Sequence, residues 1–595
     1  MTQRLANIIA VLSLIIMAVL MIGSAKHDSL TFDEKAHIAA GYSYLFAQDY
    51  RVNPEHPPLA KDLAAIPLML GNFNWPQNSP MWTKPYEDIS VAWWQQFDLG
   101  NEFLFKSGNN ADKIIFMARM PMIILTLLLG IIIFYIAKKY WGHDVAAIAT
   151  FFYAFSPDII AHGRLVTIDV VAAFGAVISV FTWIEFLKNP NWKNVFWAGL
   201  AFGIAMICKY SLILLIPVFI ILTIIYPLII GKKVKDLWPY LGKSLVIGLI
   251  GMFLIVWPAY YFNMRNMPQA KINFDANINL RDHKIPIAKN IDLWMLKSDA
   301  FRPIGYWAYG VLMAGQRTLG GNTTFFMGEI SSKSWAGYFP TLYLIKFPLA
   351  FHLLCLLALI WAICSIQRPW FKYIVRRKID WVKNNFELYA MVVFVVIYWL
   401  TAILGNLNIG LRHVLPTFPF IFIFTAIGMN NLINCDYQCL PKTKKIGKWL
   451  LIVLFAWYGL STIFCYPYYI SHCNELVGGP ANGYKYAVDS NYDWGQDFND
   501  LIKFVEKNKV YNLKLHYFGG ADPNYYIPDR IKYYNAKENG PTTGWIAVSA
   551  NEMMGGMAKP VKGYEQNSDY YKWLLNYQPV ARAGYSIFIY NIPEK

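Results

Sequence analysis

The chain has 595 residues, of which 56% are hydrophobic and only 15% are charged, with a mean hydropathy of +0.32. Soluble globular proteins carry about 25% charged residues, so the composition argues against a soluble enzyme. The net charge of +16 would suggest a nucleic-acid partner only if the basic residues formed an exposed patch. They fall mostly in short loops between apolar runs, which excludes nucleic acid and predicts a polytopic membrane protein.

Apolar runs long enough to cross a bilayer recur along the chain up to residue 466. The first resembles a signal peptide, but it has no convincing cleavage site and further spans follow, so we interpret it as an uncleaved anchor. One run, 195–230, would be about 54 Å long as a single helix, against a hydrocarbon core of about 30 Å. It therefore crosses twice, with a break at Cys208-Lys209-Tyr210-Ser211, and about eleven transmembrane helices result. The runs lie at 5–23, 114–137, 145–161, 168–187, 195–230, 241–258, 341–364, 387–404, 413–432 and 449–466.

The basic loops predict the orientation, because cytoplasmic loops carry an excess of Lys and Arg. With eleven spans they all fall on one side, the N-terminus is cytoplasmic and the C-terminus is extracytoplasmic. A single crossing at 195–230 would move the loop Gly231–Asp236 to the outside and break the rule. The loops are Lys138-Lys139, Lys188 with Lys193, Lys232 to Lys235, 368–383 and Lys442 to Lys448.

This topology places two large loops and the C-terminal part of the chain outside. We expect a membrane module, 1–466, with outer loops at 26–112 and 259–340, short outer turns at 162–167 and 405–412, and an extracytoplasmic domain at 467–595. The first loop contains helical stretches and a group of tryptophans that suits either an interfacial belt or sugar stacking. These are Trp75, Trp82, Trp93 and Trp94.

The C-terminal domain has the pattern of a small α/β unit. The segments LKLHYFG, WIAVSA and YSIFIYNI read as short strands, and DFNDLIKFVEKN reads as an amphipathic helix. The acidic residues near its start imitate part of a calcium-binding loop, but Trp494 stands where that loop requires glycine. We therefore do not expect calcium there. These residues are Asp489, Asn491, Asp493, Asp497 and Asp500.

An acidic pair follows the first span directly. Thr31 and Glu34 have the spacing of a capping box, so Glu34 has a ready structural explanation. Asp33 is less well explained by capping, and it shares a helix face with His37. A carboxylate at the outer mouth of a membrane bundle could act as a general base on a bound hydroxyl.

Several cations fall beside spans on the outer side, where Lys and Arg are depleted and need a reason. They are Lys61, Arg119, Arg164, Lys209 and the pair Arg412-His413. Each alone could extend to lipid headgroups or pair with a nearby acid such as Asp169 or Glu329. Together they would form an anion pocket suited to a lipid-linked phosphate. Glu329, just before a re-entering aromatic segment, could be a sugar or metal ligand.

The motifs resemble the bacterial branch of the GT-C glycosyltransferases, related to protein O-mannosyltransferases and the lipid A aminoarabinose transferase. The resemblance runs from about residue 5 to the end. It implies an inverting glycosyltransferase that moves a sugar from a polyprenyl-phosphate donor on the extracytoplasmic face. The motifs, in order, are TFDEKAH, NPEHPPLAK, MARMP, GRLVTIDV, GLAFGIAMICKYS, MGEISSKSWAGYFP, NIGLRHVLPTFP and NELVGGPANGYKYAVDSNYDWGQDF.

The resemblance also implies roles for individual residues. Asp33 would activate the acceptor, with Glu34 beside it. The donor phosphate or sugar would be held by His56, Lys61, Arg119, Arg164, Lys209, Arg412 and His413, supported by His37, Asp169 and Glu329. His56 stands where the aminoarabinose transferases tend to have lysine, and loop 259–340 is too short for the β-trefoil module of the eukaryotic O-mannosyltransferases.

Several alternatives remain open at this point. The acceptor could be a lipid, a glycan or a protein, and Asp33, Glu34, His37 and Glu329 could bind a divalent metal as readily as transfer protons. A transporter or flippase of a polyprenyl-linked or anionic lipid would need the cationic pocket without Asp33. A non-catalytic envelope scaffold would use only the outer domain. The expected location is the bacterial cytoplasmic membrane, in contact with its lipids.

Overall fold

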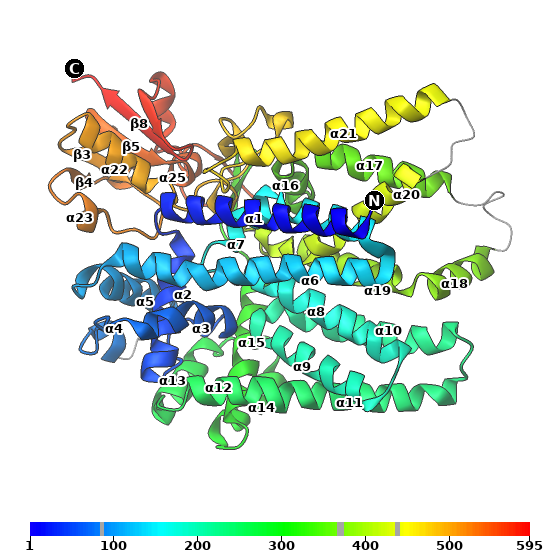
Figure 1. Ribbon diagram of the computed structural model, residues 1–595. Helices are drawn as coiled ribbons and strands as arrows, with labels where there is room; N and C mark the ends of the chain where they lie inside the picture. Colours follow the sequence, from blue (N-terminus) through cyan, green and yellow to red (C-terminus); the bar gives the residue numbers. More distant parts are fainter. Residues whose placement is uncertain (84–88, 366–373, 435–440, 595) are drawn as a thin grey trace.

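The computed structural model of the chain describes all residues except 84–88, 366–373, 435–440 and 595. Long helices lie side by side in a bundle, and a small domain containing the β-strands covers one end of it (Figure 1). Part of the predicted basic loop 368–383 falls outside the described residues.

The bundle is built from the apolar runs that the sequence shows, with short helices in two of the basic loops between them. Their helices are α1 (Gln3–His27), α6 (Ala111–Ala154), α7 (Pro157–Gly163), α8 (Asp169–Lys188), α9 (Trp192–Cys208), η4 (Tyr210–Leu214), α10 (Leu215–Ile229), η5 (Val234–Leu237), α11 (Trp238–Gly251), η6 (Met252–Val256), α12 (Trp257–Asn263), α16 (Tyr338–Lys346), α17 (Leu349–Cys364), α18 (Ile374–Asn384), α19 (Phe386–Leu404), η7 (Leu411–Thr417), α20 (Phe418–Asn434) and α21 (Pro441–Phe464).

The described residues contain eight helices long and apolar enough to cross a membrane, or nine if the bent pair α16 and α17 is one span. α6 bends at Gly142, where φ is 87°, and its second arm returns so that the Tyr153 hydroxyl donates to the Thr126 carbonyl. α9, with 17 residues, is a shorter apolar helix. Counting this arm and α9 as well gives the eleven spans predicted, and the predicted break between α9 and α10 is present at Lys209.

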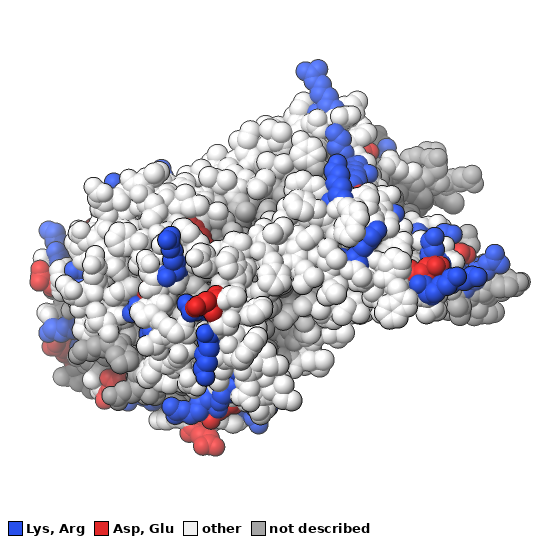
Figure 2. Space-filling view, turned by 90° about the horizontal axis from the view of Figure 1, so that it is seen from below, with Lys and Arg blue, Asp and Glu red and all other residues white. Residues whose placement is uncertain are grey.

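The outer surface of the bundle suits lipid. Large apolar side chains point outward along it, for example Val19 and Leu245, with 65% and 67% of their surface exposed. In Figure 2 the Lys and Arg side chains gather toward the two ends of the molecule, and the surface between them is largely uncharged. In water such a surface would be unfavourable, so the chain is a multi-pass membrane protein.

The two large loops pack at the same end of the bundle as the C-terminal domain (Figure 1). The first is helical, as predicted, and the second ends in a β-hairpin. Their elements are α2 (Phe32–Tyr42), η1 (Ser43–Ala47), α3 (Leu59–Ala65), η2 (Ile66–Leu70), α4 (Pro80–Thr83), α5 (Ile89–Asn101) and η3 (Glu102–Lys106), then α13 (Gln269–Asn279), α14 (Pro286–Lys297), α15 (Arg302–Gly320), β1 (Thr324–Phe326) and β2 (Glu329–Ser331).

The C-terminal domain holds a five-stranded mixed sheet with strand order β4-β3-β5-β8-β7. The three predicted strands and the predicted helix are confirmed as β3 (Leu513–His516), β5 (Gly544–Ser549), β8 (Ile587–Ile592) and α22 (Phe498–Lys507). The other elements are η8 (Glu475–Val477), η9 (Gly483–Lys485), η10 (Asp489–Asn491), α23 (Pro523–Tyr526), β4 (Ile531–Tyr533), α24 (Ala536–Asn539), α25 (Ala550–Gly555), β6 (Lys559–Val561), η11 (Lys572–Asn576) and β7 (Ala581–Ala583).

A second, three-stranded sheet ties this domain to the second loop. β2 of the loop hairpin pairs in parallel with β6 of the C-terminal domain, in the order β1-β2-β6. The register joins Glu329 to Lys559 and Ser331 to Val561. Loop and domain therefore form one continuous wall over the end of the bundle.

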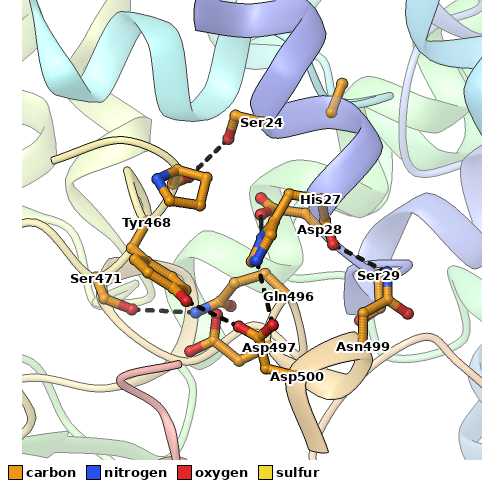
Figure 3. Close-up of polar contacts among 12 residues, drawn as sticks. Ser24, His27, Asp28, Ser29, Tyr468, Ser471, Gln496, Asp497, Asn499 and Asp500 are labelled. Atoms are coloured by element: carbon orange, nitrogen blue, oxygen red, sulfur yellow. Dashed lines mark hydrogen bonds and ion pairs between the residues drawn. The ribbon is translucent and has the colours of Figure 1, made fainter. Parts of the chain in front are cut away.

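The end of α1 is joined to the C-terminal domain by polar contacts (Figure 3). Ser24 Oγ donates to the Pro467 carbonyl at 2.7 Å. The His27 ring lies between two carboxylates, with Nδ1 3.3 Å from Asp28 and Nε2 3.2 Å from Asp500. These contacts fix the chain where it leaves the membrane.

Two backbone hydrogen bonds extend this junction to the start of α2. The Ser29 amide donates to the Gln496 carbonyl at 2.9 Å, and the Phe32 amide donates to the Trp494 carbonyl at 3.0 Å. The first turn of α2, which carries Asp33, is therefore positioned by residues more than 450 positions away along the chain.

Candidate active site

A cavity of about 930 Å³ lies where α2, the α9–α10 break, α15, η7 and the C-terminal domain meet. This volume is within the range of small-molecule sites in proteins, about 300–1,000 Å³. Its polar and charged lining includes Asp33, His37, Asn53, Glu55, His56, Asp169, Lys209, Arg317, Asn408, Arg412, His413, Asp489, Asn551 and Glu552.

Asp33 lies in the first turn of α2 with its carboxylate on this cavity. Its Oδ2 accepts a hydrogen bond from Arg412 Nη1 at 2.8 Å, and 21% of the side chain is exposed. It is the neighbour of the capping acid rather than the capping acid itself. Capping therefore does not use its carboxylate, which lies on the cavity beside Arg412.

Arg412 and Lys209 share one buried acid. Lys209 Nζ donates to Asp169 Oδ1 at 2.6 Å, and Arg412 Nη1 is 3.5 Å from Asp169 Oδ2. Arg412 Nε donates to Ser490 Oγ at 3.0 Å, and its guanidinium stacks 4.2 Å from the Trp494 ring. The break between α9 and α10 places Lys209 here, since its extended backbone interrupts the helical hydrogen bonding. Lys209 and Arg412 therefore bring two cations to this side of the cavity, where Asp169 and Asp33 balance them in the absence of a ligand.

Glu34, the second acid of the pair, lies away from the cavity. Glu34 is fully buried, does not line the cavity and accepts from Arg119 Nε at 2.9 Å and Nη2 at 2.6 Å. It also accepts from the Val166 amide at 3.0 Å and from Thr31 N at 3.1 Å and Oγ1 at 3.0 Å. Burial alone would raise the pKa of Glu34, but Arg119 and these donors lower it. The geometry therefore fits the capping interpretation.

Three of the predicted cations have their donors directed into the protein and do not line the cavity. Arg119 uses its remaining donors on the Ala25, Asp28 and Ser29 carbonyls at 2.8–2.9 Å. Arg164 binds the Asp28 carboxylate and the Ile160 and Ala161 carbonyls. Lys61 Nζ donates to Tyr44 Oη, to His56 O and to both oxygens of Asn53, at 2.7–3.1 Å. None of the three reaches the position of Lys209 and Arg412.

The predicted histidines do line the cavity. The rings of His37 and His56 pack edge to face at 5.4 Å, and His37 Nδ1 lies 2.8 Å from the Val166 carbonyl. Burial lowers the pKa of both, so both are neutral at pH 7. His413 Nε2 is buried with no hydrogen-bond partner among the described residues. A neutral imidazole of this kind can donate to an oxygen of a bound ligand.

Glu329 lies in β2 and is not part of the cavity lining. Within the described residues, no group of three or more His, Cys, Asp or Glu side chains is arranged to hold a metal ion. The calcium-like motif does not form such a group either, because its acids bind backbone amides. Asp493 accepts from the Asn551 amide, and Asp497 accepts from the Tyr585 and Ser586 amides.

The structure adds residues that sequence reasoning missed. Arg317, in α15, lies on the cavity, pairs with Glu55 at 3.0 Å and stacks 5.5 Å from the Trp93 ring. Its surrounding sequence carries no distinguishing signal. Asp489 and Glu552 also lie on the cavity. Asp489 belongs to the calcium-like acidic motif noted in the sequence, whereas Glu552 lies in no such motif.

Comparisons with known proteins agree with this architecture. The family model of dolichyl-phosphate-mannose-protein mannosyltransferases matches residues 110–257. No curated protein matches the chain in sequence.

Solved structures give the fold. The S. cerevisiae protein O-mannosyltransferase Pmt1-Pmt2 complex bound to the sugar donor matches with a TM-score of 0.53 at 12% identity, over 78% of this chain and 90% of that chain. ArnT from Cupriavidus metallidurans bound to undecaprenyl phosphate matches with a TM-score of 0.44 at 11% identity, over 97% of each chain. AglB from Archaeoglobus fulgidus matches with a TM-score of 0.44 at 11% identity, over 92% of this chain and 71% of that chain. The GT-C fold expected from the sequence is confirmed, and it rests on the S. cerevisiae match.

Proposed function

We propose that this membrane protein, which has the GT-C glycosyltransferase fold, transfers a sugar from a polyprenyl-phosphate donor to an acceptor hydroxyl with inversion at the anomeric carbon. The relatives support this chemistry, since one was solved with a sugar donor and another with undecaprenyl phosphate. A polytopic enzyme can take such a donor directly from the lipid phase.

The observation that carries the proposal is the contact between Asp33 and Arg412. A carboxylate accessible to substrate lies 2.8 Å from a cation that also belongs to the Lys209 and Asp169 cluster. A transferase of this kind needs both, a base for the acceptor and positive charge for the departing phosphate.

The reaction we propose is a single displacement. The acceptor oxygen attacks the anomeric carbon and forms the new glycosidic bond, while the bond from that carbon to the phosphate oxygen breaks. Asp33 takes the acceptor proton. The polyprenyl phosphate leaves with its charge balanced by Lys209 and Arg412 and a hydrogen bond from His413.

The same contact suggests how donor binding prepares the base. Without substrate, Asp33 is held by Arg412. A phosphate that enters the cluster competes for the guanidinium and releases Asp33 toward the acceptor. The base is then set free only when a donor is present.

The proposed location is the extracytoplasmic face. The cavity lies at the end of the bundle that carries the C-terminal domain, away from the α10–α11 loop with Lys232 and Lys233 (Figure 1). The positive-inside rule assigns that basic loop to the cytoplasm, which places Asp33 on the opposite side.

The test compares wild type, Asp33→Asn and the control Asp282→Asn, an exposed acid of the second loop. Purified proteins receive undecaprenyl-phosphate donors carrying radiolabelled hexose or pentose, with a membrane extract as acceptor source. Loss of a general base lowers transfer by about 10²–10⁴-fold, while undecaprenyl phosphate binding persists. Equal transfer by Asp33→Asn would overturn the base assignment. Donor binding by wild type without any transfer would favour a transporter.

A further inference from the structure

The charges on the cavity wall are divided between two sides. Each cation on it is already paired with an acid of the lining, Lys209 with Asp169, Arg412 with Asp33 and Arg317 with Glu55. All of these residues come from the membrane helices and their loops. Under the proposed function the donor phosphate binds on this side, where it displaces Asp33 from Arg412.

The C-terminal domain contributes two acids that form no direct ion pair with Lys or Arg. Asp489 and Glu552 line the same cavity, and among the described residues neither has a Lys or Arg within ion-pair distance. The nearest basic group to Glu552 is His516 Nε2 at 3.4 Å. Burial lowers the pKa of His516 to about 4, so this histidine is neutral at pH 7 and does not balance the carboxylate, whose own pKa burial raises to about 7.

Asp489 is held in an uncommon backbone conformation beside the reaction centre. Its φ is +57°, a left-handed value that non-glycine residues adopt only rarely and that often marks functional positions. The Tyr492 and Asp493 amides donate to its carbonyl at 2.9 Å and keep it there. Its carboxylate faces Arg412 and Asp33 closely enough that their charges shift its pKa, which burial raises to about 6.

Glu552 is positioned by the fold of the C-terminal domain. It follows Asn551 at the start of α25, and the Asn551 amide donates to the buried Asp493 at 2.8 Å. His516 is itself fixed by Tyr571 at 2.8 Å from its Nδ1. The Glu552 side chain is 27% exposed and lies on the cavity, so it can accept hydrogen bonds from a bound molecule.

Flat aromatic faces lie along the same wall. Phe518 stacks on Phe32, next to Asp33, with ring centroids 4.9 Å apart, and Phe97 and Trp94 extend this cluster at 4.6 and 6.5 Å from Phe32. All four line the cavity, and Trp94 keeps 52% of its surface exposed. Aromatic faces together with carboxylate and amide groups suit a molecule that has apolar flat faces and a rim of hydroxyls.

We infer that the wall formed by Asp489, Asn551, Glu552 and Phe518 is the acceptor subsite, and that it binds an uncharged glycan through its hydroxyl groups. This rests on the proposed function, which assigns the cationic side to the donor. The described residues of this wall include no Lys or Arg, so a phosphorylated acceptor would meet carboxyl oxygens there and no cation to pair with, which is unfavourable in a site of low dielectric. Sugar hydroxyls, by contrast, donate to carboxylates without that cost.

The test measures binding to the full-length protein in detergent by microscale thermophoresis. Saturation with undecaprenyl phosphate first occupies the cationic side, and that titration by itself tests the donor assignment. The probes are a panel of neutral gluco-, manno- and N-acetylglucosamine oligosaccharides of two to five units, glucose 6-phosphate, and an uncharged serine tripeptide. Glu552→Gln and Asp489→Asn are compared with Glu565→Gln, an exposed acid of the same domain.

We expect at least one neutral oligosaccharide to bind with a Kd of about 1 mM or tighter, and both site variants to weaken it by about 10-fold or more. Glu565→Gln should bind the glycan as wild type does, and Glu552→Gln should keep the wild-type affinity for undecaprenyl phosphate. Glu552→Asp should restore part of the glycan binding. Glycan binding that is absent, unaffected by both site variants, or weaker than that of the phosphate or the peptide would overturn the inference. Failure of undecaprenyl phosphate to bind would instead overturn the donor assignment. The glycan titration, repeated in the absence of undecaprenyl phosphate, would then still test the acceptor subsite.

Discussion

Replacing Glu34 by alanine separates its role from that of its neighbour Asp33. The buried Glu34 carboxylate accepts five hydrogen bonds of 2.6–3.1 Å, two of them from Arg119. Without it the Arg119 charge remains inside the protein with no acid partner, and the Val166 amide loses its acceptor. Breaking a buried ion pair on one side costs about 3–5 kcal/mol. That is a large part of a typical folding stability of about 5–15 kcal/mol.

Alanine at Asp33 should cost far less. Arg412 would keep Asp169 at 3.5 Å and Ser490 at 3.0 Å, and a partly exposed pair contributes about 0–1 kcal/mol. Unfolding of purified protein by SDS titration, followed by tryptophan fluorescence, measures both. We expect a strong loss of stability for Glu34→Ala, near wild-type stability for Asp33→Ala, and partial recovery in the double variant Glu34→Ala with Arg119→Met.

The variant Glu34→Gln tests the capping explanation of Glu34 directly. The amide keeps one acceptor oxygen, for either the Thr31 groups or the Val166 amide, and loses the charge. If this variant unfolds like wild type and yet transfers no sugar, Glu34 takes part in the chemistry and the capping explanation is wrong.

Two further predictions concern charge in the site and in the domain. Lys209→Met should weaken undecaprenyl phosphate binding by about 10–100-fold, because it removes a charge-assisted hydrogen bond. Lys209→Arg should keep most of the affinity. Isothermal titration calorimetry measures this, and equal affinities for wild type and both variants would contradict the prediction. Burial raises the pKa of Asp497 from 3.8 to about 7, so folding disfavours its charged form and stability falls as pH rises from about 4 to 7. Asp497→Asn should therefore be more stable than wild type at pH 8, by roughly 4 kcal/mol at most, and no more stable at pH 4. Thermal unfolding measures both, and an equal gain in stability at the two pH values would contradict the prediction.

The elements that the sequence predicts well depend on local patterns. The spans follow from apolar length, the strands of the C-terminal domain from alternation, and the break at Lys209 from a run too long for one crossing. The capping explanation of Glu34 follows from its spacing to Thr31. In each case neighbours along the chain contain the information.

The cations show where this reasoning stops. Arg119 and Arg164 lie beside spans just as Lys209 and Arg412 do, and all four read alike in sequence. Tertiary packing separates them. Arg119 donates hydrogen bonds to carbonyls near the end of α1, and Arg164 donates to Asp28. Arg317 reaches the cavity only through the placement of α15. The pairing of β2 with β6 likewise joins segments more than 200 residues apart, with no local signal in either.

The backbone link from Phe32 to Trp494 has a consequence for the order of biosynthesis. Asp33 emerges from the ribosome early, but the residues that anchor its helix and close the cavity are made after the last span has been inserted. A nascent chain therefore carries the proposed base without the wall that faces it. Under the proposed function, sugar transfer can begin only once the final strands have folded onto the membrane helices, so a partly synthesised chain would not consume lipid-linked sugar.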